Sequence, residues 1–351
     1  MELSLYCPEC GFYEKEKDNI GRRGDFLTSV SVGSLFGELL AFQFAEWLQS
    51  SMVSSQSSVA RLVEAGAHDG RLASDILRSL RDRRNDLFNR LEYWIVEPST
   101  RRREWQRESL ADFAETVRWI DDIAALQGTL QSSCTVIFSN ELLDAMPLHR
   151  LIWDAMARKW FEWGVALENG SFAWTRLGDA GNLISRFTFQ GIELEKLSDV
   201  LPDGFTVEVS PAAERWWRKA AGVLKSGKLM TIDYGLAAEE FFTPERKDGT
   251  LRAYRAHHFI NDVLANPGEQ DITAHVNFSA IQNAGETAGL KTDAYVSQAK
   301  FLTGIAEQTW KHPDMFGDWT PVRTRQFQTL THPEHLGRPF RVLVQSRQSG
   351  D

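Results

Sequence analysis

The sequence predicts an α/β protein built on an open, mostly parallel sheet of the nucleotide-binding kind. Three observations lead to this fold class. A strand, a glycine-containing turn and an amphipathic helix follow one another within residues 59–80. An apolar strand over 91–96 ends in Glu97. A further strand over 135–139 is apolar throughout, as expected where both faces of a parallel sheet are covered.

Length, composition and charge limit the possible functions. The 351 residues could bury one large core or two modest ones, and 42% apolar with 25% charged residues is ordinary for a globular protein. A formal net charge of −9 opposes binding to a nucleic-acid backbone, which selects basic surfaces. No apolar run is long enough to span a bilayer. We therefore expect neither nucleic acid nor membrane as a partner, and no oligomeric state follows from the sequence.

The cysteines indicate a reducing compartment and no metal. Three cysteines cannot form a disulfide framework, and the N-terminus lacks the pattern of a signal peptide, so we expect a cytoplasmic protein. Cys7 and Cys10 resemble half of a zinc ribbon, but Cys134 lies alone in an apolar strand and nothing nearby completes four ligands. The histidines and acids of 257–275 also lack ligand spacing.

The segment before the first strand, residues 1–58, contains a helix. Residues 14–34 are polar and glycine-rich, a helical pattern begins at Leu35, and 50–58 read as a polar linker. The stretch Gly-Asp-Phe-Leu-Thr-Ser over 24–29 lies just before the helix, where functional loop residues often occur. Turn formation and helix capping are the alternative explanation.

The first strand carries the glycine turn. Glu64 stands near its carboxyl end, and Gly66 and Gly70 bracket the turn that leads into the helix. Glycines let backbone N–H groups approach a ligand, and a helix N-terminus favours an anionic group. Glu64 would suit a cationic or hydroxyl-bearing ligand better than a phosphate. Tight packing between strand and helix is the alternative.

Acidic residues follow the second and third strands. Glu97 stands where this architecture commonly holds a ribose diol, although it lies further beyond the glycine turn than usual. An exposed acid at the start of the next helix is the alternative. The third strand, 117–120, ends in Asp121 and Asp122. These are candidate partners for an adenine amine, or residues of a solvated turn.

The strand over 135–139 is followed by Asn140, Glu141 and Asp144. An amide and two carboxylates after an apolar strand are costly if they are merely buried. The carboxyl edge of an open parallel sheet is where ligands bind, so these residues are predicted to face one. Capping of the following turn is the alternative.

Later segments predict insertions and a closing strand pair. Alternation over 150–178, with a turn at 168–170, predicts an inserted antiparallel hairpin. We expect insertions at about 150–205 and 240–278. The chain ends with two segments predicted as a terminal β-hairpin at a sheet edge, RQFQTLTH and FRVLVQSR.

These motifs together resemble one family. The combination of Gly-Asp-Phe-x-Thr-Ser with Asn-Glu-Leu-Leu-Asp-Ala is more specific than a generic nucleotide-binding fold. The chain resembles the MidA-like family of S-adenosylmethionine-dependent methyltransferases, which includes a mitochondrial factor that methylates an arginine of a complex I subunit. The matching stretches are Leu5–Pro8, Gly11–Tyr13, Gly24–Ser29, Leu35–Glu38, Val63–Gly66 with Gly70, Glu97–Ser99, Ser139–Pro147, Asp233–Gly235 and Asp271–Phe278.

The resemblance implies a class I methyltransferase (Rossmann-like) sheet and S-adenosylmethionine as the cofactor. Residues 1–58 would form an N-terminal helical segment covering the site, and 59–351 the methyltransferase domain with its insertions. The implied reaction is methyl transfer to an arginine of a protein substrate. A non-catalytic cofactor-binding assembly factor and a small-molecule methyltransferase are the alternatives.

The resemblance also suggests roles for individual residues. Glu141 and Asp144 would hold a guanidinium and accept or relay its proton, with Asp25 and Thr28 closing the pocket. The expected cofactor-binding residues are Thr28, Glu64, Gly66, His68, Gly70, Glu97, Asp121, Asp122 and Asn140.

The chain departs from the family pattern in three places. His68 stands where the family has a glycine. Its side chain hinders one close approach of the backbone to the cofactor, but the ring could instead hydrogen-bond the cofactor carboxylate. Cys7 and Cys10 stand where relatives carry other residues. Met1 falls where relatives already have an N-terminal helix, so we expect that this chain starts late.

Overall fold

The computed structural model describes residues 1–15, 28–55, 59–129, 134–185, 199–255 and 258–348. The chain forms two compact units. The predicted catalytic residue Asp25 lies outside the described residues. Unit 1 comprises 1–15, 143–217 and 234–284, and unit 2 comprises 16–142, 218–233 and 285–351.

Unit 2 contains the predicted sheet. The pairs β1–β2, β2–β3, β1–β4 and β4–β9 are parallel, and β14–β15 is antiparallel. The sheet extends from β1 through β2 and β3 to one side and through β4 and β9 to the other, so the order reverses between β1 and β4. In open α/β sheets, ligands bind at such a switch point. The spatial order is β14 (Lys291–Ser297), β15 (Phe340–Arg347), β9 (Gly227–Leu236, in unit 2 as far as Asp233), β4 (Cys134–Asn140), β1 (Ala60–Ala65), β2 (Leu91–Val96) and β3 (Val117–Ile120).

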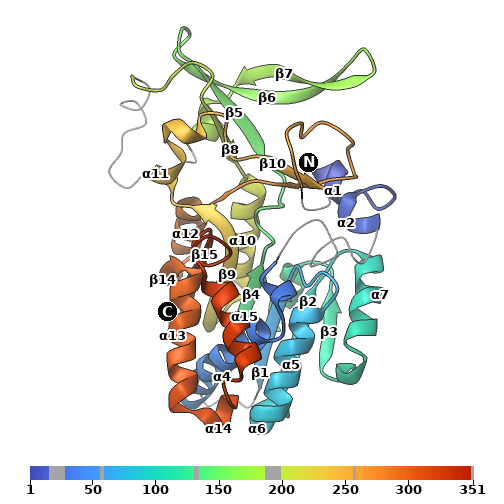
Figure 1. Cartoon of the computed structure of the whole chain (residues 1–351), viewed down its shortest axis with the longest axis vertical. Coiled ribbons are helices and arrows are strands. Elements are labelled where there is room, and N and C mark those ends of the chain that lie inside the picture. The colour runs from blue at the N-terminus through green and yellow to red at the C-terminus, as the bar shows by residue number, and fades with distance from the viewer. Residues whose placement is uncertain (16–27, 56–58, 130–133, 186–198, 256–257, 349–351) are drawn as a thin grey trace. The chain divides into compact units, whose positions relative to one another are not determined.

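Helix α4 packs against strand β4 of this sheet and against helix α5. It also contacts α13 and α15 (Figure 1). Helix α5 buries Leu72, Ile76 and Leu80 on one face, as their spacing predicts. Strand β4 is buried along nearly its whole length. The helices of unit 2 are α3 (Ser29–Val32), α4 (Leu35–Ser55), α5 (Arg71–Arg83), α6 (Asn85–Phe88), α7 (Thr100–Ser109), α13 (Gln298–Lys311), α14 (Pro313–Phe316) and α15 (Pro321–Thr331), with the 3₁₀ turns η1 (Ala111–Phe113) and η2 (Ile123–Leu126).

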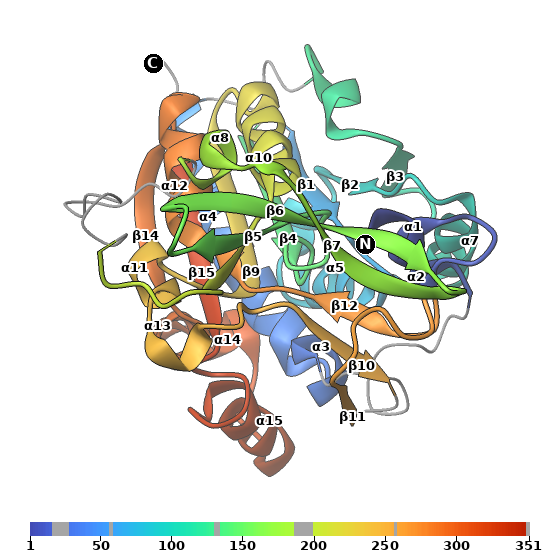
Figure 2. The same cartoon turned by 90° about the horizontal axis from the view of Figure 1, so that it is seen from above.

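Unit 1 contains two small sheets. The first has the order β7-β6-β5-β8, with antiparallel pairing throughout (Figure 2). The second has the order β11-β10-β12. The strands are β5 (His149–Asp154), β6 (Lys159–Glu168), β7 (Ser171–Asp179), β8 (Thr206–Val209), β10 (Arg252–Arg255), β11 (His258–Ile260) and β12 (Asp271–Thr273), and β13 (Val276–Asn277) pairs with β9 beyond Tyr234.

The helices of unit 1 cover two apolar clusters. One cluster includes Trp153, Trp160 and Phe241, and the other is formed around Leu5 and Phe12. Helices α10 (Pro211–Val223) and α12 (Phe278–Thr287) belong partly to each unit. The others are α1 (Glu2–Tyr6), α2 (Phe12–Lys15), α8 (Gly181–Ile184) and α11 (Ala238–Phe241), with the 3₁₀ turn η3 (Pro244–Arg246).

The α/β prediction and the inserted hairpin are confirmed. Strands β6 and β7 form that hairpin, and Asn169 and Gly170 both have positive φ, +50° and +80°. Two consecutive positive φ values are typical of the tight turns that match the twist of paired strands. The predicted insertions at about 150–205 and 240–278 lie within unit 1.

Two predicted elements are corrected. The segment RQFQTLTH was predicted as a strand but lies in helix α15, which Thr320 caps and Pro321 begins. These are helix start signals that outweigh a short alternating pattern. The antiparallel partner of β15 is β14 instead. The predicted linker over 50–58 is helical as far as Ser55, because tertiary packing of α4 overrides the weak propensity of its serines.

Candidate active site

A pocket of about 80 Å³ opens in unit 2 at the switch point between β1 and β4. It is formed by the turn after β1, the end of β4 and the residues that begin α3. Six predicted site residues line it, which brings together positions far apart in the sequence: Thr28, Glu64, Gly66, His68, Asn140 and Glu141.

The turn after β1 needs glycine at both ends. Gly66 and Gly70 have φ of +78° and +84°, which side-chain-bearing residues rarely adopt. A Cβ on Gly66 would lie 3.0 Å from Leu142 Cδ1, so a larger residue would also crowd the pocket wall. His68, between them, has φ of +47° despite its Cβ. The turn is therefore held in a conformation that its sequence only partly favours.

Glu64 is a buried carboxylate on the pocket wall. Its residue is 2% exposed, and Tyr93 Oη donates a hydrogen bond to Oε2 at 2.6 Å. Burial raises the pKa of Glu64 to about 7, nearby Asp69 adds to this, and the Tyr93 hydrogen bond opposes it. A cationic group in the pocket would favour the ionised form. Tyr93 was missed from the sequence, although a hydroxyl within an apolar strand signals a buried partner.

The end of β4 presents Asn140 and Glu141. Glu141 has φ of +53° and its N–H donates to Ile232 O on β9 at 2.9 Å. Its Oε1 accepts hydrogen bonds from Asn140 Nδ2 at 3.0 Å and from the N–H of Ser29 at 3.3 Å. The left-handed backbone and these bonds fix the carboxylate at the pocket wall. Strained residues that their surroundings hold in place tend to occur at functional sites.

Two buried polar atoms of this pocket lack hydrogen-bond partners among the described residues. They are His68 Nε2 and Asn140 Oδ1. Buried polar atoms in native proteins are nearly always paired, so each such atom indicates a ligand or a water. With the Glu64 carboxylate they form a set of donors and acceptors that matches the ammonium and carboxylate of an amino acid.

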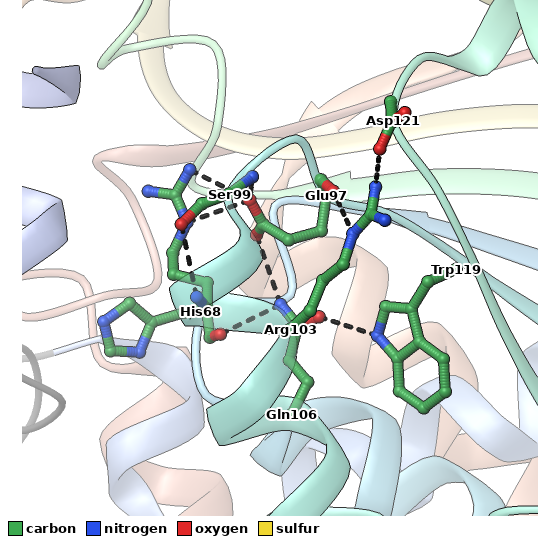
Figure 3. A network of polar contacts seen from close by, with 8 residues as sticks. His68, Glu97, Ser99, Arg103, Gln106, Trp119 and Asp121 are labelled. Carbon is green, nitrogen blue, oxygen red and sulfur yellow. Dashed lines mark hydrogen bonds and ion pairs between the residues drawn. The ribbon is translucent and has the colours of Figure 1, made fainter. Parts of the chain in front are cut away.

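Glu97 lies outside the lining of this pocket, and Gln106 connects it to the pocket residue His68 (Figure 3). The residue is 2% exposed, so the alternative of an exposed helix-start acid is wrong. Oε1 accepts from the N–H of Ser99 and from Arg102 Nε, both at 2.9 Å. Oε2 accepts from Gln106 Nε2 at 3.2 Å. The predicted contact of Glu97 with a ribose remains a prediction.

Neither aspartate after β3 lines the pocket. The Asp121 side chain is 81% exposed and pairs with Arg103, which also donates to Glu97 O at 2.6 Å (Figure 3). Asp122 accepts from the N–H of Ala124 at the start of η2 and pairs with Lys219 at 3.0 Å. Their predicted contact with adenine remains untested.

Asp144 belongs to unit 1, where it lines a separate cavity of about 30 Å³ with Glu208, Glu214 and His275. Both ring nitrogens of His275 are buried and lack hydrogen-bond partners among the described residues. Burial lowers the pKa of His275 to about 3, and Arg252 nearby acts in the same direction. The ring is therefore neutral at physiological pH and can accept a hydrogen bond.

The described ranges contain neither a cluster of metal-ligating side chains nor a membrane-spanning helix. There, no group of three or more His, Cys, Asp or Glu side chains is placed to hold a metal ion. No helix in that part of the chain is long and apolar enough to cross a membrane.

Comparisons with known proteins agree with this geometry. The family model for S-adenosyl-L-methionine-dependent methyltransferases named Methyltransf_28 matches residues 39–296. A crystal structure of a COG1565 superfamily member from Burkholderia thailandensis, bound to S-adenosyl-homocysteine, is 31% identical. It aligns with a TM-score of 0.80 over 99% of this chain and 86% of that chain.

Curated relatives extend over nearly the whole chain. The Drosophila melanogaster protein named "Protein arginine methyltransferase NDUFAF7 homolog, mitochondrial" is 27% identical over 98% of this chain and 79% of its own length. The Rattus norvegicus "Protein arginine methyltransferase NDUFAF7, mitochondrial" is 28% identical with the same coverage.

The predicted cytoplasmic location is wrong by this comparison, because these relatives are named as mitochondrial proteins. The cysteine count argues only against a disulfide framework, and it does not single out the cytosol.

The switch-point pocket, the family match and the bound cofactor of the solved relative agree on the cofactor and the class of enzyme. The chain belongs to this family of S-adenosyl-L-methionine-dependent methyltransferases.

Proposed function

We propose that this enzyme transfers the methyl group of S-adenosylmethionine to a guanidinium nitrogen of an arginine in a protein substrate. The curated relatives named as protein arginine methyltransferases support this substrate class. The observation that carries it within this chain is Glu141, a carboxylate fixed on the pocket wall by the left-handed backbone and by two donors.

Different residues contact the amino-acid end and the ribose of the cofactor. Glu64 accepts hydrogen bonds from the ammonium of the cofactor, and His68 donates to its carboxylate in the tautomer that carries the hydrogen on Nε2. Asn140 Oδ1 accepts a second hydrogen bond from the ammonium. The Glu97 carboxylate accepts from a ribose hydroxyl at the end of β2. Thr28 lies on the side of the pocket formed by the start of α3.

The reaction needs an oriented guanidinium and an acceptor for its proton. S-adenosylmethionine supplies a methyl carbon made electrophilic by the sulfonium. Glu141 pairs with the guanidinium, concentrates its charge away from the attacking nitrogen and orients that nitrogen in line with the methyl. The new N–C bond forms as the C–S bond breaks, with its electron pair going to sulfur. Glu141 takes the proton that the methylated nitrogen releases. Asp144 and Asp25 remain further candidates for holding the substrate.

Glu141→Gln tests this role because it keeps the side chain's size and removes its charge. We expect methyl transfer to an arginine-containing protein to fall by about a hundredfold or more, the scale for a positioned acid–base group. Calorimetric affinity for S-adenosylhomocysteine should be unchanged. The matched control is Glu92→Gln, which removes a carboxylate paired with Arg61 on the same sheet but outside the pocket.

Full activity in Glu141→Gln would remove this residue from the mechanism. Loss of cofactor binding together with transfer would make Glu141 a cofactor ligand and leave Asp144 or Asp25 as the carboxylate that faces the substrate.

A further inference from the structure

A buried glutamine on α7 links the ends of three neighbouring strands (Figure 3). Gln106 is 0% exposed. Its Oε1 accepts from Trp119 Nε1 on β3 at 2.9 Å. Its Nε2 donates to His68 O in the turn after β1 at 3.0 Å and to Glu97 Oε2 after β2 at 3.2 Å. One amide therefore contacts the turn after β1, the residue that follows β2 and strand β3.

The chemistry of the three partners fixes the orientation of this amide. An indole N–H can only donate, so it must face Oε1 of Gln106. A main-chain carbonyl and an ionised carboxylate can only accept, so they must face Nε2. Both hydrogens of Nε2 are used and no arrangement with the amide flipped satisfies the same partners. The network is thus fully satisfied and specific to an amide at position 106.

The bond to His68 holds a strained residue. A side-chain-bearing residue at φ of +47° is disfavoured, whereas glycine adopts this conformation freely. The hydrogen bond from Gln106 fixes the carbonyl of His68 and so opposes relaxation of the turn. The same residue presents Nε2, buried and without a partner among the described residues, at the pocket wall. Holding the backbone of His68 therefore also aims its ring.

The bond to Glu97 orients a carboxylate that still has acceptor capacity. Arg102 and the N–H of Ser99 both contact Oε1, whereas Gln106 is the partner of Oε2 within the described parts of the chain. A carboxylate offers about four lone-pair sites. The amide thus sets the plane of the carboxylate while one position on Oε2 stays available for a hydroxyl.

We propose that Gln106 is a positioning residue for cofactor binding, which holds the turn at His68 and the carboxylate of Glu97 in their binding geometry together. This inference rests on the proposed use of His68 and Glu97 as cofactor ligands. Gln106 itself does not line the pocket. It acts through its two partners, as supporting residues behind a binding site commonly do.

Gln106→Met tests the proposal, because methionine fills a similar volume without hydrogen bonds. We expect S-adenosylhomocysteine to bind about tenfold or more weakly by calorimetry, since two hydrogen bonds that order the site are lost. Gln106→Glu keeps an acceptor for Trp119 but places a carboxylate against Glu97 and His68 O. It should bind more weakly than Gln106→Met.

The control is Gln345→Met, at a second glutamine that is 0% exposed in the same sheet. Gln345 donates to Thr292 Oγ1 at 2.9 Å on β14, at the opposite edge. This variant should lower the melting temperature to a similar extent while leaving the affinity for S-adenosylhomocysteine unchanged.

The His68→Gly background separates the effect of the Gln106 bond to His68 from the effect of its bond to Glu97. Glycine needs no help to adopt the left-handed conformation, so Gln106→Met should weaken binding by a smaller factor in that background than in wild type. A Gln106→Met protein that is less stable but binds S-adenosylhomocysteine as tightly as wild type would overturn the proposal. Absence of binding in wild type would instead reject the cofactor pocket itself.

Discussion

Glu64 and Glu97 stand at or just beyond the carboxyl ends of neighbouring parallel strands, and each is 2% exposed. They differ in what the protein offers them. Glu64 receives one tyrosine hydroxyl, and its pKa is raised to about 7. Glu97 receives a guanidinium, a main-chain N–H and an amide. Equal burial therefore does not mean that the protein stabilises two carboxylates equally. Glu97 is already paired with a cationic side chain, whereas the described residues offer Glu64 a tyrosine hydroxyl and no cation.

The largest loss of cofactor affinity is expected from a substitution at Gly66, two residues after Glu64. In Gly66→Val, a branched side chain would meet Leu142 and the backbone would be strained at φ of +78°. We expect affinity for S-adenosylhomocysteine to fall by at least about a hundredfold, as expected when a pocket is filled and its turn displaced, with the fold retained. Calorimetry and circular dichroism would measure the two effects.

Gly128→Val is the matched control for this change. Gly128 also has a positive φ, +84°, but a Cβ there would meet nothing within 4 Å. It should lose a similar amount of stability without losing cofactor affinity. Unchanged affinity in a folded Gly66→Val protein would show that the turn serves packing alone.

Glutamine substitutions at the two carboxylates should have unequal effects on stability. Glu97→Gln leaves Arg102, itself 9% exposed, without a charged partner, and removing one member of a buried ion pair costs about 3 kcal/mol or more. Glu64→Gln keeps an acceptor for Tyr93 and leaves no unpaired charge. Urea unfolding at pH 5, where Glu64 is protonated and as neutral as glutamine, should therefore show a large loss for Glu97→Gln and a small change for Glu64→Gln. Equal losses would contradict the distinction.

The sign of the Glu64→Gln effect depends on pH. The pKa of Glu64 is raised above its unfolded value, so its favourable contribution is present below about pH 4.5 and is lost as pH rises through about 7. Glutamine does not titrate. The stability of wild type relative to Glu64→Gln should thus fall between pH 5 and 8, by up to about 3 kcal/mol. A difference that stays constant over this range would show that Glu64 is not shifted.

Much of the fold could be predicted from the sequence because the strands of a parallel sheet are apolar runs that end in polar residues. It placed β1, β2, β3 and β4 and predicted that Glu64 and Glu141 face a ligand. It could not show that Glu97 is buried, since that depends on Arg102 returning one helical turn later to meet it. Tyr93 and Gln106 were missed because their partners come from other elements.

The least effect is expected at Cys7 and Cys10. Cys7 is half-buried, Cys10 is exposed and neither forms a disulfide. The Cys10 S–H donates a hydrogen bond to the Cys7 sulfur, which lowers the pKa of Cys7, and a serine hydroxyl can replace this donor. Replacing both with serine should change the free energy of unfolding by less than about 0.5 kcal/mol and leave cofactor affinity unchanged. Stoichiometric zinc that disappears with this double change would overturn the prediction.

The most direct test of the account is the pH dependence of S-adenosylhomocysteine binding in wild type and in Glu64→Gln. If the ionised Glu64 carboxylate receives the cofactor's ammonium, wild-type affinity should be about tenfold weaker at pH 6 than at pH 8, because a group with a pKa of about 7 is mostly protonated at pH 6. Binding at pH 6 should release a proton, measurable in buffers of different ionisation enthalpy. Glu64→Gln should bind more weakly and with little pH dependence. Equal affinity and equal pH dependence in the two proteins would contradict the assignment of Glu64 as the carboxylate that faces the cofactor.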